Sequence, residues 1–300
     1  MAVAPRHVLA AAGRTLVLGE RPLLMGIVNA SPDSFSDPGA YPDLDARVRR
    51  ARELVEQGAD IIDVGGESAT TRRPPVEAAD EIDRVAPLVA AIAAQLGVIV
   101  SVDTYKPAVA EAAIAAGASI VNDVSGLRDP ALAGVCARTG AALVLMHTRA
   151  APKQRLQDPD RYDDVFADVA AFLAERMRVA REEGVRDEQI VLDPGPDFAK
   201  TPAQTIALLR RLEELHELGR PLLLAVSRKD FVGALTGRGP RERAAGTLAA
   251  VGFGVDAGAH ILRVHDVDQA ADFLRVRAAL RGELEVDPQL ALGEAIRHAR

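Results

Sequence analysis

The chain has 300 residues, of which 48% are hydrophobic and 26% are charged. This composition is typical of a globular domain and excludes a disordered chain. A net charge of −7 with only 3% aromatic residues argues against a nucleic-acid-binding protein, because such proteins present basic surfaces and stacking rings. With one cysteine, Cys136, no internal disulfide can form. We find no signal-peptide pattern and no long uncharged apolar stretch, so we expect a cytoplasmic protein.

Short segments rich in β-branched residues alternate with longer alanine-rich segments along the chain. In chain order, strands are predicted at 23–28, 60–64, 98–102, 119–122, 142–146, 190–192, 222–226 and 260–264. Helices are predicted at 43–57, 76–95, 106–116, 129–139, 161–184, 202–218, 241–257 and 268–281. Apolar runs with little alternation are typical of strands that are buried on both faces, which indicates a parallel sheet.

Eight strands in alternation with eight helices are typical of an α/β protein with a (β/α)8 TIM barrel. An open, doubly wound sheet is the alternative, because alternation alone does not require closure. No linker-like stretch interrupts the pattern, so we expect a single domain over 1–300 with the barrel at about 22–282. A short N-terminal β-hairpin at 8–18 is expected to plug one end of the barrel, and an extra C-terminal helix is expected from Asp287 onward.

Polar or ionisable residues follow every predicted strand. In chain order these are Asn29, Asp63, Asp103, Asn122, His147, Asp193, Ser227 with Lys229, and Arg263 with His265. Enzymes with a barrel fold carry their reacting groups at the C-terminal ends of the strands. The sequence therefore predicts one polar site at one mouth of the barrel.

The choice of basic residues is uneven. Only four of the 36 are lysines, and all four follow predicted strands: Lys106, Lys153, Lys200 and Lys229. A lysine retained in an arginine-rich chain is a candidate for a role that the planar guanidinium cannot fill. Charge-assisted hydrogen bonds to a phosphate group are predicted for four basic side chains: Arg72, Lys229, Arg263 and His265. A Schiff base on Lys229, as in an aldolase, is another use of the same amine.

Three carboxylates, Asp63, Asp103 and Asp193, end predicted strands that face a shared axis. Two interpretations remain open for them: ligands of Mg²⁺, or acceptors for a heterocycle that presents N–H donors. The two histidines at strand ends are too few and too far apart for a zinc site. No glycine-rich fingerprint follows the first strand, so a dinucleotide site is not predicted.

Long motifs at these strand ends resemble those of dihydropteroate synthases, a family of pterin-binding TIM barrels. The resemblance covers about residues 23–280 and rests on MGIVNASPDSFSD (25–37), GADIIDVGGES (58–68), SVDT (101–104), NDVSG (122–126), MH (146–147), DPG with FAKT (193–201), SRK (227–229) and RVHDV (263–267). It implies a transferase of folate biosynthesis that joins 4-aminobenzoate to 6-hydroxymethyl-7,8-dihydropterin diphosphate. The products are 7,8-dihydropteroate and pyrophosphate. It also implies Mg²⁺ as cofactor and a homodimer, with no nucleic-acid or membrane partner.

The resemblance further implies roles for individual residues. Residues implied to bind the pterin are Asp103, Asn122, Met146, Asp193 and Lys229, and of these Asp103 and Lys229 are the implied catalytic residues. Residues implied to bind the diphosphate are Asn29, Arg72, Arg263 and His265, and Asn29 is also the implied ligand of Mg²⁺. Residues implied to lie on the 4-aminobenzoate side are Thr71, Phe198, Ser227 and Asp230.

Several loops on the amine side differ from the family pattern. Residues 67–75 read ESATTRRPP where ESTRPG is usual, Asp197 stands where glycine normally precedes Phe198, and Asp230 follows Lys229 where serine or a basic residue is common. Two acids facing the substrate carboxylate would weaken its binding, whereas acids paired with arginines would leave it unchanged. We therefore retain a second hypothesis, a pterin-binding paralogue that lacks dihydropteroate synthase activity or uses a different amine acceptor.

Overall fold

The computed structural model describes residues 4–30, 43–67, 74–293 and 297, in which parallel strands form a nearly closed barrel. The strand order is β8-β7-β6-β5-β4-β3-β10-β9, and the two edge strands meet at a parallel bridge between Leu192 and Leu222. The open-sheet alternative is therefore wrong, and the barrel is confirmed. The strands span Leu23–Asn29 (β3), Ile61–Gly65 (β4), Ile99–Asp103 (β5), Ile120–Asp123 (β6), Ala142–Met146 (β7), Ile190–Asp193 (β8), Leu223–Leu224 (β9) and Ile261–Val264 (β10).

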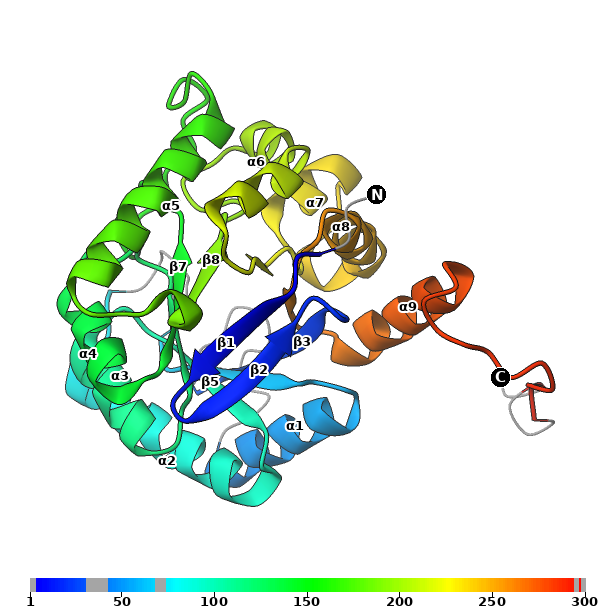
Figure 1. The fold of residues 1–300 in the computed structure, drawn as a ribbon, viewed down its shortest axis with the longest axis horizontal. Coiled ribbons are helices and arrows are strands. Elements are labelled where there is room, and N and C mark those ends of the chain that lie inside the picture. Colours follow the sequence, from blue (N-terminus) through cyan, green and yellow to red (C-terminus); the bar gives the residue numbers. More distant parts are fainter. Residues whose placement is uncertain (1–3, 31–42, 68–73, 294–296, 298–300) are drawn as a thin grey trace.

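The helices form a ring around the barrel, and α9 extends away from it toward the C-terminal tail (Figure 1). The α-helices span Leu44–Glu56 (α1), Ala78–Leu96 (α2), Pro107–Ala115 (α3), Ala131–Thr139 (α4), Val165–Glu182 (α5), Pro202–Leu209 (α6), Asp230–Thr236 (α7), Ala244–Asp256 (α8) and Val267–Leu280 (α9). Short 3₁₀ helices span Asp187–Gln189 (η1), Leu212–Leu218 (η2) and Pro240–Glu242 (η3).

Sequence and structure differ in three elements around the seventh strand. The helix predicted at 202–218 divides into α6 and η2, and the strand predicted at 222–226 shortens to the two residues of β9. Helix α7 was not predicted, because seven residues are too few to show a helical period. The start of α6 follows its sequence signal: the Thr201 hydroxyl accepts a hydrogen bond from Gln204 N, and the Gln204 side chain accepts one from Thr201 N.

Side chains alternate between the barrel interior and the helical layer, as the period of a strand requires. On β4, Ile61 lies in the interior cluster, whereas Ile62 and Val64 pack in the cluster between strands and helices. Asp63 therefore lies on the interior face, two residues beyond Ile61 and near the C-terminal end of the strand. The same alternation brings the polar ends of the other strands to one mouth.

The N-terminal hairpin closes the opposite end of the barrel, as predicted. Its strands β1 (His7–Ala11) and β2 (Arg14–Leu18) pair antiparallel and lie across the barrel in Figure 1. Leu9, Leu16 and Leu18 are buried in the same cluster as the interior residues of the barrel strands. Burial of these leucines stabilises the fold by roughly 1.5–3 kcal/mol per side chain before entropy is counted.

The chain after α9 forms turns and irregular structure as far as Gly293. The extra helix that we expected from Asp287 is therefore wrong for residues 287–293, and the rest of it falls mostly on residues outside the described part of the chain, namely 294–296 and 298–300. Within the described residues, none of the helices has the length and apolar character needed to cross a membrane.

Candidate active site at the C-terminal mouth of the barrel

A buried charge cluster joins three strands at the mouth. Arg263 on β10 donates from Nε to Asp63 Oδ2 of β4 at 2.7 Å and from Nη2 to Asp103 Oδ2 of β5 at 2.8 Å. Asn122 on β6 donates to the same Asp63 oxygen at 3.3 Å. The strand register explains the grouping, since Asp103 and Asn122 are direct neighbours across β5 and β6. Four residues that the sequence predicted for the site are thus brought together.

Polar atoms in this part of the barrel lack partners within the described protein. They are Asp63 Oδ1, Asn122 Oδ1 and Ser101 Oγ, on the adjacent strands β4, β6 and β5. Buried polar groups are nearly always hydrogen-bonded. Two of the three atoms are pure acceptors, so the pattern fits a bound molecule that offers N–H or O–H donors. Ser101 had no role in the sequence prediction, because an isolated serine inside a strand carries no signal of its own.

The opposite charges in the cluster each favour the ionised form of the other. Burial raises the pKa of Asp103 to about 7, and the neighbouring Arg263 opposes that shift. Burial disfavours the charged form of Arg263, but Asp63 and Asp103 outweigh it and raise the pKa of the guanidinium. In the described part of the chain, no group of three or more acidic, histidine or cysteine side chains is arranged to hold a metal. Because Arg263 already pairs with Asp63 and Asp103, the arrangement favours heterocycle recognition over a three-carboxylate Mg²⁺ site.

Asp193 and Lys229 lie at the ends of the next strands around the mouth. Asp193 is 3% exposed and accepts a hydrogen bond from Gly195 N at 2.7 Å. Burial raises the pKa of Asp193, whereas the bond from Gly195 and the charge of Lys229 oppose the rise. Lys229 Nζ lies 4.2 Å from the centroid of the Phe198 ring, a cation–π contact. Lys229 thus stands between Asp193, on the predicted pterin side, and Phe198, on the predicted amine side.

His265 is a neutral imidazole that contacts Ser227. Ser227 Oγ lies 2.9 Å from His265 Nδ1 and accepts a hydrogen bond from His265 N. Burial, together with nearby arginines, lowers the pKa of His265 to about 3. If the hydroxyl donates to Nδ1, the Nε2–H of His265 is the donor left for a ligand. An anion would therefore meet a neutral hydrogen-bond donor here, and not the cation that the sequence suggested.

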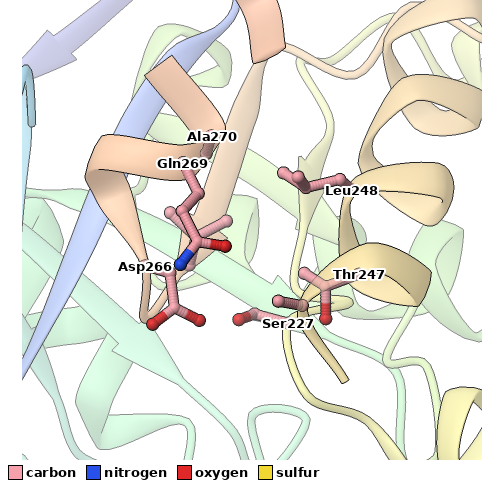
Figure 2. Close-up of a pocket in the computed structure, with 8 residues that line it drawn as sticks. Ser227, Thr247, Leu248, Asp266, Gln269 and Ala270 are labelled. Atoms are coloured by element: carbon pink, nitrogen blue, oxygen red, sulfur yellow. The ribbon is translucent and has the colours of Figure 1, made fainter. Parts of the chain in front are cut away.

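A small cavity lies behind Ser227, between α8 and α9, and has room for about one water molecule (Figure 2). Its lining residues are Ser227, Ala244, Thr247, Leu248, Val264, Asp266, Gln269 and Ala270. The cavity is too small for a substrate of the predicted size. The cavity lies between the loops after β9 and β10. A bidentate ion pair between Arg228 and Asp266, with distances of 2.6 and 3.1 Å, joins these two loops.

The two acids that depart from the motifs of the resembled family, Asp197 and Asp230, do not share one environment. Asp197 accepts hydrogen bonds from Thr205 Oγ1 at 2.9 Å and from Phe231 N at 3.2 Å, so its carboxylate joins the loop after β8 to the start of α7. The Asp230 side chain is 55% exposed and pairs with Arg243 at 3.3 Å. Both carboxylates therefore have structural partners, and among the described residues the arginines that pair with Asp230 are Arg243 and, at 4.0 Å, Arg155.

The remaining predicted residues divide between described and undescribed parts. Met146 is buried at the end of β7, and Asn29 ends β3 half-buried. Thr71 and Arg72 lie outside the described residues, so their predicted roles stay predictions. Two features escaped the sequence prediction: a cluster of Glu67 with Lys106 and Lys153, and the contacts of Lys200, which is fully buried. Their only sequence signal was the scarcity of lysine.

Comparison with known proteins identifies the family of this chain. The model of the family described as pterin binding enzyme matches residues 25–265. A dihydropteroate synthase of Bacillus subtilis (strain 168) is 44% identical over 263 residues, which cover 87% of this chain and 89% of the relative. The solved structure of Xanthomonas albilineans dihydropteroate synthase with 4-aminobenzoic acid has a TM-score of 0.83 at 42% identity and covers 93% of this chain and 98% of its own.

A second structure of the Xanthomonas albilineans enzyme, in complex with 7,8-dihydropteroate, has a TM-score of 0.81 at 42% identity and covers 92% of this chain and 99% of its own. The family match extends from within β3 to the residue after β10. The chain belongs to the dihydropteroate synthase family of pterin-binding enzymes.

Proposed function

We infer that this chain is a transferase of folate biosynthesis that condenses 4-aminobenzoate with 6-hydroxymethyl-7,8-dihydropterin diphosphate. The products are 7,8-dihydropteroate and pyrophosphate. The observation that carries the inference is the buried cluster in which Asp63 and Asp103 share Arg263, while oxygens of Asp63 and Asn122 have no partner among the described residues. Open acceptors in a buried, charge-balanced site suit a flat heterocycle rich in N–H groups, and a pterin is such a heterocycle.

The pterin would lie over the charge cluster. Asp103, Asn122 and Asp193 supply side-chain acceptors for its ring and amino N–H groups, and the Met146 side chain supplies an apolar wall. Lys229 donates to an acceptor on the ring. Because these side chains come from rigid strand ends, the ring is bound with little reorganisation, which suits a preorganised site.

The diphosphate would extend toward the loops after β3, β4 and β10. Arg263 and His265 offer donors from β10, and Arg72 is the predicted donor from the second loop. Mg²⁺ is usually held by one or two protein oxygens with substrate phosphates and water, so the amide oxygen of Asn29 fits a metal that arrives with the diphosphate. When bound, Mg²⁺ would neutralise charge on the leaving pyrophosphate.

The reaction replaces one bond by another at the methylene carbon of the pterin. The C–O bond to the diphosphate breaks with its electron pair going to pyrophosphate, the amine nitrogen of 4-aminobenzoate forms the new C–N bond, and the amine releases one proton. The carboxylate of Asp103 stabilises positive charge on the pterin as the C–O bond lengthens. The charge of Arg263 opposes the burial that raises the pKa of Asp103 and so favours the ionised form that this role requires.

4-Aminobenzoate would approach from the side of Phe198 and Lys229. The Phe198 ring packs against the arene, and Ser227 lies next to the loop that carries Lys229. Thr71 and Asp230 are the other predicted residues on this side. Since the Asp230 carboxylate pairs with Arg243, we propose that it lines the entrance without opposing the substrate carboxylate.

One assay tests the proposed function. The purified protein is mixed with the pterin diphosphate, Mg²⁺ and 4-aminobenzoate, and both pyrophosphate and dihydropteroate are followed. We expect the two products in equal amounts. Tight binding of the pterin diphosphate without either product would contradict the proposal and favour a pterin-binding paralogue. Pyrophosphate released with a different amine, but not with 4-aminobenzoate, would favour another acceptor.

We further propose that residues 1–300 form a single pterin-binding domain, that the protein acts in the cytoplasm, and that it forms a homodimer. The argument for the dimer is the exposure of large apolar side chains on the outer helices: Phe253 of α8 is 49% exposed, and Val276 and Leu280 of α9 are 59% and 84% exposed. Large exposed apolar surfaces commonly mark protein interfaces. Sedimentation of wild type and of Leu280→Glu tests this, and a monomeric wild-type protein would contradict it.

A further inference from the structure

Lys200 is a fully buried lysine with a complete set of hydrogen-bond partners. Its Nζ lies 2.7 Å from His147 Nδ1, 2.9 Å from Gly195 O and 3.1 Å from Phe198 O, and the residue is 0% exposed. An ammonium group has three N–H donors and no acceptor. The three neighbouring acceptors therefore match a protonated Lys200 and an imidazole whose Nδ1 carries no proton.

The hydrogen bonds continue outward from His147 to the protein surface. His147 Nε2 lies 2.9 Å from Asp168 Oδ1 on α5, and Asp168 forms a bidentate pair with Arg149 at 2.7 and 3.0 Å. A carboxylate only accepts, so Nε2 carries the proton. Burial lowers the pKa of His147 to about 4, against the opposing effect of Asp168. The imidazole is therefore neutral and relays a hydrogen bond between a cation and an anion.

The inner end of this chain of contacts lies against the proposed pterin site. The loop of residues 195–199 that Lys200 binds through two carbonyls begins directly after Asp193-Pro194 and includes Phe198, the ring beneath Lys229. His147 N also donates to Asp193 O at 2.9 Å. Asp197 and Ala199 have φ of 64° and 52°, a left-handed conformation that non-glycine residues rarely adopt. The loop thus needs contacts that hold it in place.

Lys200 also faces the charged groups of the site. Burial lowers the pKa of Lys200 to about 7, and the nearby Asp193, Asp168 and Asp197 oppose the decrease, whereas Lys229 adds to it. If the proton moved from Lys200 to Nδ1 of His147, the pair would still carry one positive charge, and every hydrogen bond would remain. Below pH 7 a positive charge therefore lies next to Asp193.

We propose that Lys200, His147 and Asp168 form a positioning network for the pterin site. The network fixes the loop after β8, and its charge keeps Asp193 a carboxylate that accepts hydrogen bonds from the pterin. None of the three residues touches the reacting atoms, so each acts through Asp193 and Phe198. The proposal depends on the proposed function in one respect, namely that Asp193 binds a pterin.

The central experiment compares wild type with Lys200→Met, which keeps the length of the side chain and removes its charge. The ligand is 6-hydroxymethylpterin, which has no diphosphate and cannot react, and its affinity is measured by calorimetry between pH 5.5 and 7.5. Wild-type affinity should be nearly constant over this range. The variant should bind at least tenfold more weakly at pH 5.5 and recover as the pH rises, because Asp193 without its counter-ion becomes protonated at low pH.

The other two residues test the same network if Lys200→Met fails to fold. His147→Gln keeps a side chain that can accept from Lys200, and should retain more pterin affinity than His147→Leu. Asp168→Asn should weaken pterin binding several-fold, whereas the control Glu182→Gln, which alters an exposed carboxylate paired with Arg178 on the same helix, should have no effect. In steady-state kinetics, the KM for the pterin diphosphate should rise more than kcat falls.

Hydrogen exchange separates this proposal from the proposed function. Amides of residues 195–199 should exchange at least tenfold faster in Lys200→Met and Asp168→Asn than in wild type, whether or not the enzyme makes dihydropteroate. A wild type without product but with these exchange differences would refute the function and support the positioning of the loop. Unchanged exchange and unchanged pterin affinity in Lys200→Met would overturn the network. An affinity loss equal at every pH would overturn the role of its charge.

Discussion

His260 makes the stability of the fold sensitive to acid. The ring lies at the N-terminal end of the barrel, is 0% exposed, accepts a hydrogen bond from Leu222 N on Nδ1 at 3.0 Å, and donates from Nε2 to Pro5 O at 2.8 Å. It thereby ties the segment before the hairpin to the loop that enters β9. Protonation of Nδ1 would place two N–H groups against each other. Burial lowers the pKa of His260 from 6.5 to about 4, against the opposing bond to Pro5.

The size of the stability loss at acidic pH follows from proton linkage. The folded state takes up this proton near pH 4 and the unfolded state near pH 6.5, so the contribution of His260 to stability is complete above pH 6.5. It decreases as the pH falls toward 4 and then levels off. Between pH 7.5 and 5 the decrease is about 2 kcal/mol, and its upper limit is about 3 kcal/mol. This is a substantial fraction of the stability of an ordinary domain.

Chemical denaturation of wild type and His260→Asn at pH 7.5 and pH 5 checks the calculation. The asparagine keeps an acceptor for Leu222 N and removes the titrating ring, so the variant should lose about 2 kcal/mol less than wild type between the two pH values. His7→Asn is the control, because the His7 ring lies 5.1 Å from His260 but is partly exposed. Equal losses in wild type and His260→Asn would refute the reasoning.

Three further predictions concern the amine side of the site. Lys229→Arg should lower kcat/KM by a factor that corresponds to about 2 kcal/mol or more, because the longer, planar guanidinium does not fit the point between Asp193 and Phe198 that the compact ammonium occupies, and steady-state kinetics near wild-type values would contradict this. Asp230→Ser should leave the KM for 4-aminobenzoate at low salt within about twofold of wild type, because the carboxylate is exposed and paired with Arg243; a clear decrease in KM would mean that the acid faces the substrate. 4-Aminobenzoate should bind more tightly by calorimetry when pyrophosphate and Mg²⁺ are present, because the turn-rich loops at 30–40 and 67–76 have little apolar content to order them, and equal affinity would exclude ordered binding.

The barrel and the place of its site could be predicted because both follow from local periodicity. Apolar runs of strand length between helical patterns predict parallel strands, and the residue type at the end of each run is read directly. Asp63, Asp103 and Asn122 were located in this way, and they lie together at one mouth. The strand ends that the prediction missed by one or two residues did not change the face on which these side chains lie.

Helix α7 and the hairpin that plugs the barrel show two different limits of prediction from the sequence. Helix α7 is seven residues long and follows Lys229 directly, so its hydrophobic pattern covers too few turns to be recognised. The hairpin could be predicted to plug the barrel because Leu9, Leu16 and Leu18 had to be buried somewhere. His260 binds Pro5, in the segment before the hairpin, and the two residues are more than two hundred positions apart. No local sequence pattern encodes such a contact.

The sequence by itself determined which groups stand at the mouth: the acids, the amide and the retained lysines are there because strand ends in a barrel converge. Only the tertiary structure decided how they pair. Arg263 finds Asp63 and Asp103 across 200 and 160 residues, and Lys200 finds His147 across 53. The protonation states of the site residues also depend on the tertiary structure. The burial and the neighbouring cations that make His265 neutral come from several strands at once. Distance along the chain carries no information about such contacts, because closure of the barrel sets them.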